Sequence, residues 1–230
     1  MSCVTSLIIV VLGILLGASI YINWNFYTHY LRDPNYPCIY YTDIDYRSGD
    51  LLFFRSVLSF HSFFSGEEMT HTGVVLEINK KLYLLELTTP NVKLTPLFER
   101  LSLFKDGWVF YKKLRNPIPI PSPETLERLQ NLAKNIEYPK TLIESAKIRF
   151  SKTNLANPDV KMDCSRFALY VLKELGILHE SANPNFKVLT WLNNMNDTYH
   201  PTQQISFFDE TCRKDEKDLY SFTDAVLDML

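Results

Sequence analysis

The segment HTGVVLEINKKLYLLELT (residues 71–88) contains two apolar runs separated by three polar residues. The runs, His71–Ile78 and Leu82–Thr88, are rich in leucine and in β-branched residues, which is typical of β-strands. The polar residues between them, Asn79-Lys80-Lys81, suit a tight turn. This segment therefore predicts a β-hairpin.

The length of the turn determines which side chains share a face of the hairpin. If the first two polar residues form the turn, Ile78 pairs with Lys81 and His71 lies opposite Thr88. Glu86 is then a diagonal neighbour of His71 on the same face. A two-residue turn at the second and third polar positions keeps that shared face, whereas a three-residue turn would send Glu86 to the other face.

Sequence on both sides of the hairpin predicts one α+β domain with an antiparallel sheet packed on helices. Apolar runs with turn residues beside them predict further strands, and apolar residues at helical spacing predict helices. The expected strands are Asp50–Arg55, Asn91–Leu94 and Gly107–Lys113. The expected helices are Leu97–Leu103, Pro123–Ile136 behind Ser122 as N-cap, Met162–Leu175 ending at Gly176, Val188–Met195 and Glu216–Leu230.

Composition limits the class of protein. The chain has 230 residues, 46% of them hydrophobic and 22% charged, which fits one globular domain with a short appended segment. Lys and Arg number 24 against 26 Asp and Glu, so the net charge is −2. A chain with this charge offers no broad basic surface for a phosphate backbone, and we expect no nucleic-acid partner.

The first thirty residues predict a membrane anchor. Leu7–Ile22 is almost purely apolar and no charged residue precedes Arg32. Aromatic residues extend the segment toward the roughly 20 residues of a transmembrane helix. A cleaved signal peptide is the alternative, although the basic start of such a peptide is missing. The predicted organisation is an anchor at 1–30, a stalk at 31–48 and a domain at 49–230, in a single-pass membrane protein. The orientation stays open, with a cytoplasmic domain favoured.

Cys164 is the candidate nucleophile, because it lies in the first turn of the predicted helix Met162–Leu175. Unsatisfied N–H groups at a helix start stabilise a thiolate and can bind the oxyanion formed when that thiolate attacks a carbonyl. Asp163 opposes this effect through its negative charge. A cysteine that merely packs in the core is the alternative interpretation.

His71 is the candidate base, because the hairpin places Glu86 beside it. A nucleophilic thiol needs a base, and the base needs a group that orients its ring. Leu84, Leu85 and Leu87 surround Glu86, and an unpaired carboxylate is costly in such a place. Glu86 therefore needs a partner.

Three motifs resemble the permuted branch of the NlpC/p60 superfamily of papain-like enzymes, which includes bacterial and poxviral proteins and is related to lecithin:retinol acyltransferase-like proteins. They are GDLLFF (Gly49–Phe54), THTGVVLEI (Thr70–Ile78) and DCSRFALYVL (Asp163–Leu172). The histidine precedes the cysteine, whereas unpermuted papain-like enzymes have the opposite order. The resemblance implies a circularly permuted papain-like domain in which Cys164, His71 and Glu86 act together.

The implied activity is that of a thiol hydrolase or acyltransferase. His71 would accept the Cys164 proton, the thiolate would attack an amide or ester of a lipid or peptide, and Glu86 would fix the imidazole tautomer. Tyr138 is a candidate oxyanion donor, with a packing role as the alternative. No cofactor is expected. The expected partners are the lipid bilayer and the amide or ester substrate.

Two rival interpretations follow from the same residues. His61, His71 and Cys164 could form a metal site, but they lack the close spacing of zinc ligands, so no metal is expected. A catalytically inert papain-like scaffold, serving as an anchored structural or interaction protein, is the second. The sequence also leaves open whether Cys38 and Cys212 form a disulfide.

Overall fold

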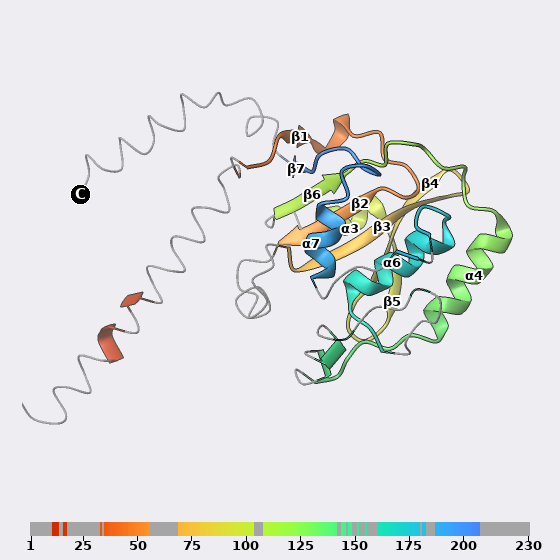
Figure 1. The fold of residues 1–230 in the computed structure, drawn as a ribbon. Helices are drawn as coiled ribbons and strands as arrows, with labels where there is room; N and C mark the ends of the chain where they lie inside the picture. The colour runs from red at the N-terminus through yellow and green to blue at the C-terminus, as the bar shows by residue number, and fades with distance from the viewer. Residues whose placement is uncertain are drawn as a thin grey trace, which may run out of the picture.

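The computed structural model describes residues 11–13, 16–17 and 33–207, with gaps at 34, 56–68, 104–107, 142–143, 146, 149–150, 152–154, 156–160, 180 and 183–186. The described elements form one seven-stranded sheet with helices on both faces (Figure 1). In chain order they are β1 (Cys38–Tyr40), the 3-10 helix η1 (Tyr41–Asp43), β2 (Leu51–Arg55), β3 (His71–Ile78), β4 (Lys81–Leu87), β5 (Val92–Pro96), α3 (Leu97–Ser102), β6 (Trp108–Lys112), α4 (Pro123–Lys134), α6 (Cys164–Glu174), α7 (Val188–Asn193) and β7 (Gln203–Ser206).

The strand order is β1-β7-β6-β2-β3-β4-β5. Neighbouring strands from β7 to β5 are antiparallel, whereas β1 pairs with β7 in parallel. The parallel pair joins Cys38 to Gln204 and so ties the beginning of the described domain to its end. The sheet is therefore mixed.

The central hairpin has the two-residue turn that the sequence predicts. Ile78 pairs with Lys81, and the turn residues Asn79 and Lys80 have φ of 51° and 62°. Positive φ at both turn positions matches a type I′ turn, whose twist suits a two-residue hairpin. The register places Glu86 on the same face of the sheet as His71.

Alternating side chains of the strands give the sheet two apolar faces. One face carries Leu51, Phe53 and Phe110, and α4, α6 and α7 cover it. The opposite face carries Leu52 and Phe54 and packs against α3 and residues 39–46. Figure 1 shows α6 and α7 on the near side of the sheet and α3 behind it.

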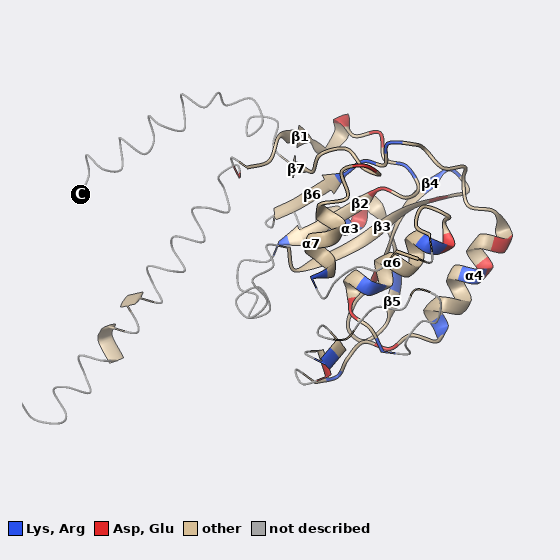
Figure 2. Ribbon diagram, viewed as in Figure 1, with Lys and Arg blue, Asp and Glu red and all other residues tan. Residues whose placement is uncertain are grey.

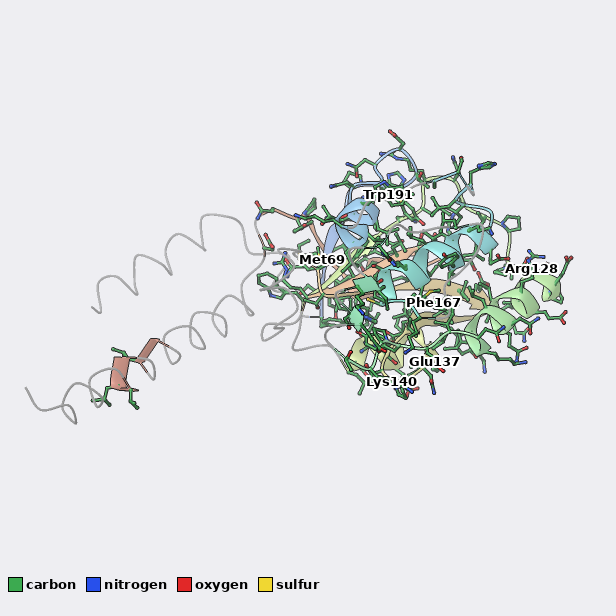
Figure 3. All side chains as sticks on the ribbon, turned by 60° about the horizontal axis from the view of Figure 1, so that its bottom comes forward. Met69, Arg128, Glu137, Lys140, Phe167 and Trp191 are labelled. Atoms are coloured by element: carbon green, nitrogen blue, oxygen red, sulfur yellow. The ribbon has the colours of Figure 1, made fainter. Side chains whose placement is uncertain are left out.

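Helix α6 lies within the helix expected at Met162–Leu175 and ends before Gly176, the expected stop. The Asp163 carboxylate accepts a hydrogen bond of 2.9 Å from the backbone N–H of Arg166, so Asp163 is the N-cap. At the other end Gly176 has φ of 72°, and its N–H donates to the carbonyl of Lys173. Arg128 on α4, labelled in Figure 3, donates to Glu174 at 2.9 Å and joins α4 to α6. The cap, the stop and this link fix the position of the helix that carries Cys164.

A buried carboxylate joins three segments at the beginning of β2. Asp50 is 1% exposed and accepts hydrogen bonds from the Tyr111 hydroxyl at 2.7 Å and from the backbone N–H groups of Arg47 and Leu114. Burial raises the pKa of Asp50, although these donors act against the shift. Asp50, in the GDLLFF motif, thus links β2 to β6 far from the strand end that carries His71.

The fold class predicted from the sequence, a permuted papain-like domain with an antiparallel sheet and an N-terminal transmembrane helix, is wrong as stated. The sheet is mixed, because β1 and β7, which lie near opposite ends of the described sequence, pair in parallel. Among the described residues no helix has the length and apolar character needed to cross a membrane. A span requires about 20 residues, and most of the expected anchor at 1–30 lies outside the described residues, as does the expected helix Glu216–Leu230.

Part of the segment predicted as a stalk belongs to the sheet. Residues 38–40 form β1, and the Asp33 carboxylate accepts a hydrogen bond of 2.8 Å from Arg55 at the end of β2. Cys38 is disulfide-bonded, and its partner lies outside the described residues, as does Cys212.

Candidate active site

His71 is the first residue of β3, at the end of the sheet where β2 finishes. It pairs with Phe54, and their rings lie 5.6 Å apart between centroids. The N–H and the hydroxyl of Thr70 both donate to the Phe54 carbonyl, at 2.8 and 2.9 Å. These bonds fix the backbone immediately before His71. Met69, labelled in Figure 3, marks this end of the sheet.

Glu86 lies beside the imidazole, as the hairpin register predicts. The distance from His71 Nε2 to Glu86 Oε2 is 2.6 Å. The Glu86 side chain is 1% exposed and that of His71 is 20% exposed. The carboxylate therefore fixes one ring nitrogen of His71 and leaves the other to a second partner.

Cys164 is the second partner of the His71 ring. It is the first residue of α6, its thiol is free, and it is 6% exposed. Helix α6 packs on β3 and β4, and Cys164 lies close enough to His71 to raise the pKa of its ring. The structure thus brings together Cys164, His71 and Glu86, the three residues that the sequence selected from positions far apart in the chain.

The electrostatics of the site favour a protonated imidazole. Burial lowers the pKa of His71, but the negative charge and hydrogen bonds of Cys164 and Glu86 outweigh burial and raise this pKa to about 9. An imidazolium beside a sulfur stabilises the thiolate, which is the reactive form of cysteine. The arrangement therefore suits an ion pair between Cys164 and His71.

Glu86 has a second partner that the sequence analysis did not identify. Arg100 on α3 donates from Nε to Oε1 at 2.6 Å and from Nη2 to Oε2 at 3.2 Å. Burial acts to raise the pKa of Glu86, but the hydrogen bonds and charges of His71 and Arg100 lower it below its usual value. Glu86 is therefore a carboxylate at neutral pH. No periodic pattern singles out Arg100 from the other charged residues of LFERLS.

Asp163 has a structural role beside the nucleophile. Its Oδ1 accepts hydrogen bonds from the Ser165 hydroxyl at 2.7 Å and from the Arg166 N–H at 2.9 Å. From its sequence position alone, Asp163 is a charge that opposes thiolate formation. In the structure two hydrogen-bond donors stabilise the negative charge of this carboxylate, which also caps the helix that carries Cys164.

The residue before Tyr138 pairs through its backbone with the segment that leads to Cys164. Glu137 forms a parallel bridge with Lys161, and its carbonyl accepts from the Met162 N–H at 3.3 Å. This pairing places the Tyr138 segment beside the residues that lead into α6. The Tyr138 ring is half-buried and packs on the core that α6 covers, so its role as an oxyanion donor stays a prediction.

The metal interpretation finds no cluster in the described part of the chain. No group of three or more His, Cys, Asp or Glu side chains there is arranged to hold a metal ion. His61, one of the three residues considered, lies outside the described residues.

Comparisons with known proteins add little to this site. No protein-family model matches the chain, and no curated protein matches it. Among solved structures, the chain is similar to the crystal structure of metalloprotein yiiX from Escherichia coli O157:H7, DUF1105, with 23% identity and a TM-score of 0.39. The match covers 56% of this chain and 66% of that chain. At this TM-score it supports no argument about fold or activity, and membership of the NlpC/p60 superfamily stays a prediction.

Proposed function

We propose that this protein is a thiol hydrolase or acyltransferase that attacks an amide or ester carbonyl through Cys164, with His71 as base and Glu86 as the group that orients it. The observation that carries the proposal is the position of the His71 ring between the Glu86 carboxylate, 2.6 Å away, and the free thiol of Cys164. A ring held between a carboxylate and a nucleophile is the arrangement used in nucleophilic acyl transfer.

The reaction has two halves. His71 takes the Cys164 proton, and the thiolate adds to the carbonyl to give a tetrahedral oxyanion. Collapse of this intermediate expels the amine or alcohol, which takes the proton from His71, and leaves a thioester on Cys164. Water or another acceptor, deprotonated by His71, then attacks the thioester. The acyl group leaves bonded to this acceptor, and Cys164 becomes a thiolate again.

The first turn of α6 supplies donors for the oxyanion. The Asp163 side chain accepts from the Arg166 N–H, and the Asp163 carbonyl accepts from the Phe167 N–H at 3.0 Å. The N–H groups of Cys164 and Ser165 precede these in the same turn, where N–H groups have no acceptor within the helix. We assign these two groups to the oxyanion, because donors at a helix start favour negative charge.

The inert scaffold remains the second candidate, because one observation favours it. Cys164 is 6% exposed, so a substrate must reach a sulfur that is almost covered. A packing cysteine would have the same burial. The two candidates differ in whether Cys164 forms a covalent acyl product.

Covalent trapping tests the proposal. The full chain is incubated with p-nitrophenyl esters of increasing acyl length and with the matching anilides, and the acyl adduct is located by mass spectrometry. We expect a thioester on Cys164, none in Cys164→Ala, and formation slowed at least about 100-fold in His71→Ala. His179, an exposed histidine, provides the control variant His179→Ala, which should behave as wild type. Equal adduct formation in wild type and His71→Ala, or no adduct from any ester or anilide, would favour the scaffold.

A further inference from the structure

Glu86 is a buried anion that contacts a cation outside the proposed chemistry. Its side chain is 1% exposed, and both of its oxygens meet the guanidinium of Arg100, at 2.6 and 3.2 Å. A buried carboxylate is stable only when it is paired and hydrogen-bonded. Arg100, together with His71, therefore keeps the Glu86 carboxylate charged.

We propose that Arg100 is a positioning residue for the Cys164 and His71 pair, because it locks the Glu86 carboxylate in the orientation in which Oε2 meets His71 Nε2. This inference rests on the proposed function, since it assigns to Arg100 the task of keeping that site reactive. Arg100 acts through Glu86 and His71.

The geometry of the guanidinium supports a positioning role. Two nitrogens of Arg100 bind two oxygens of Glu86, so the carboxylate cannot rotate without breaking a charged hydrogen bond. Oε2 is shared between Arg100 Nη2 and His71 Nε2, which joins the three side chains in one chain of contacts. A lysine in place of Arg100 could supply the charge but not the two-point contact.

Packing holds Arg100 in this place. Helix α3 buries Leu97 and Leu101 against the sheet, which fixes the backbone that carries Arg100. The guanidinium carbon lies 4.8 Å from the centroid of the Phe54 ring, and the Phe54 ring lies 5.6 Å from that of His71. Phe54 therefore contacts both ends of the chain that runs from Arg100 through Glu86 to His71.

The other charges around Glu86 and His71 do not substitute for Arg100. Lys93 pairs with Glu86 across β4 and β5, but it is exposed, and its ammonium forms no ion pair with Glu86 in the described part of the chain. Glu99 on α3 is exposed as well. On the α6 side lie the thiol of Cys164 and the capping residue Asp163. Among the described residues, Arg100 is the cation that meets Glu86 in addition to the protonated His71.

Loss of Arg100 should move the pH at which Cys164 becomes reactive. In Arg100→Gln the buried Glu86 carboxylate loses its cation, so it takes up a proton more readily and accepts less well from His71. The imidazolium then stabilises the thiolate less. We expect the alkylation rate at neutral pH to fall about tenfold, which corresponds to a displacement of the profile by about one pH unit.

The test measures alkylation of Cys164 by iodoacetamide across the pH range in the full chain, by mass spectrometry of the Cys164 peptide. The variants are Arg100→Gln, Arg100→Lys and the control Lys93→Gln, each checked for cooperative unfolding. We expect Arg100→Gln to move the profile to higher pH, Arg100→Lys to move it less, and Lys93→Gln to leave it unchanged. If Arg100→Gln does not fold, the comparison between Arg100→Lys and Lys93→Gln decides the question.

Failure of this inference can be told apart from failure of the proposed function. A wild-type cysteine that reacts below the pH of an ordinary thiol, about 8.5, with the same profile in both Arg100 variants, overturns the role of Arg100 and leaves the nucleophile intact. A wild-type profile like that of an ordinary thiol, unchanged in both variants, overturns the two proposals together.

Discussion

Gly73 lies directly against Glu86 where β3 and β4 run side by side. A Cβ at position 73 would come within 3.2 Å of the Glu86 Cβ and within 2.9 Å of the Leu84 side chain. Gly73 follows His71 by two residues, so the two positions share one face of the strand. The missing side chain of Gly73 leaves the room that Glu86 occupies beside the His71 ring.

Gly73→Ala should therefore damage the site without removing any polar group. We expect overpacking to lower the free energy of unfolding by about 1–3 kcal/mol and Cys164 alkylation at neutral pH to slow, because Glu86 is displaced from His71. Urea unfolding and alkylation kinetics measure the two effects. A stable variant with an unchanged alkylation rate would show that this close contact does not position Glu86.

The N-cap of α6 can be separated from the charge of Asp163. Asp163→Ala should lower the free energy of unfolding by about 1 kcal/mol, because the Arg166 N–H loses its acceptor, whereas Asp163→Asn should stay close to wild type. Asp163→Asn also removes a negative charge beside Cys164, so we expect alkylation at least as fast as in wild type.

Ser122→Ala is the matched control, because Ser122 caps α4 through the Thr125 N–H and is remote in sequence from Cys164. It should show a similar loss of stability with unchanged alkylation. Slower alkylation in Asp163→Asn would mean that the carboxylate assists the thiol, against our interpretation of Asp163 as a cap.

Two buried tyrosines should respond oppositely to loss of their hydroxyl groups. The Tyr111 hydroxyl donates to Asp50 at 2.7 Å, so Tyr111→Phe should lower the free energy of unfolding by about 1–2 kcal/mol. The buried Tyr46 hydroxyl has no hydrogen-bond partner within the described structure, so Tyr46→Phe should be neutral or stabilising by up to about 1 kcal/mol. Thermal and urea unfolding provide the comparison. Equal losses of unfolding free energy in the two variants would show that the hydrogen bond from Tyr111 does not stabilise the buried Asp50.

Local signals were sufficient to predict the hairpin and the cysteine helix. Either two-residue turn among the three polar residues predicted that His71 and Glu86 share a face, and the structure has the turn at Asn79-Lys80, which pairs Ile78 with Lys81. Gly176 marked the end of α6 because a stop depends on neighbouring residues alone, whereas the capping role of Asp163 at the start of α6 was missed.

Contacts between distant segments escaped prediction. Strand β7, Gln203–Ser206, is four residues long and pairs with β1, which has three residues and follows Pro37. Neither strand is long enough to show a clear alternation, and their pairing depends on how the ends of the domain meet. The mixed character of the sheet follows from this one pair.

Arg100 escaped prediction for a related reason. The apolar surroundings of Glu86 indicated that this carboxylate needs a partner, and His71 satisfied that need in the sequence analysis. The second partner comes from α3, whose position on the sheet depends on the burial of Leu97 and Leu101. A single sequence does not show which of several charged side chains points toward the sheet in the folded protein.

Stability should decline in alkaline solution because of His71. Its pKa is raised to about 9 in the folded protein from an ordinary value of 6.5, so folding favours the protonated ring. This contribution is fully present below about pH 6.5 and is lost as the pH rises through about 9. Urea unfolding at a series of pH values should show this decline in wild type and a shallower one in His71→Gln. Identical slopes would contradict the assigned contribution.

The most direct test of the contact between Cys164 and His71 is an NMR titration of the His71 ring in wild type and Cys164→Ala. The chain has five histidines, and His71→Gln assigns the resonance. We expect a wild-type midpoint near 9 and a clearly lower midpoint in Cys164→Ala, because Cys164 raises the pKa of His71. The same midpoint in both proteins, close to the ordinary 6.5, would contradict this expectation.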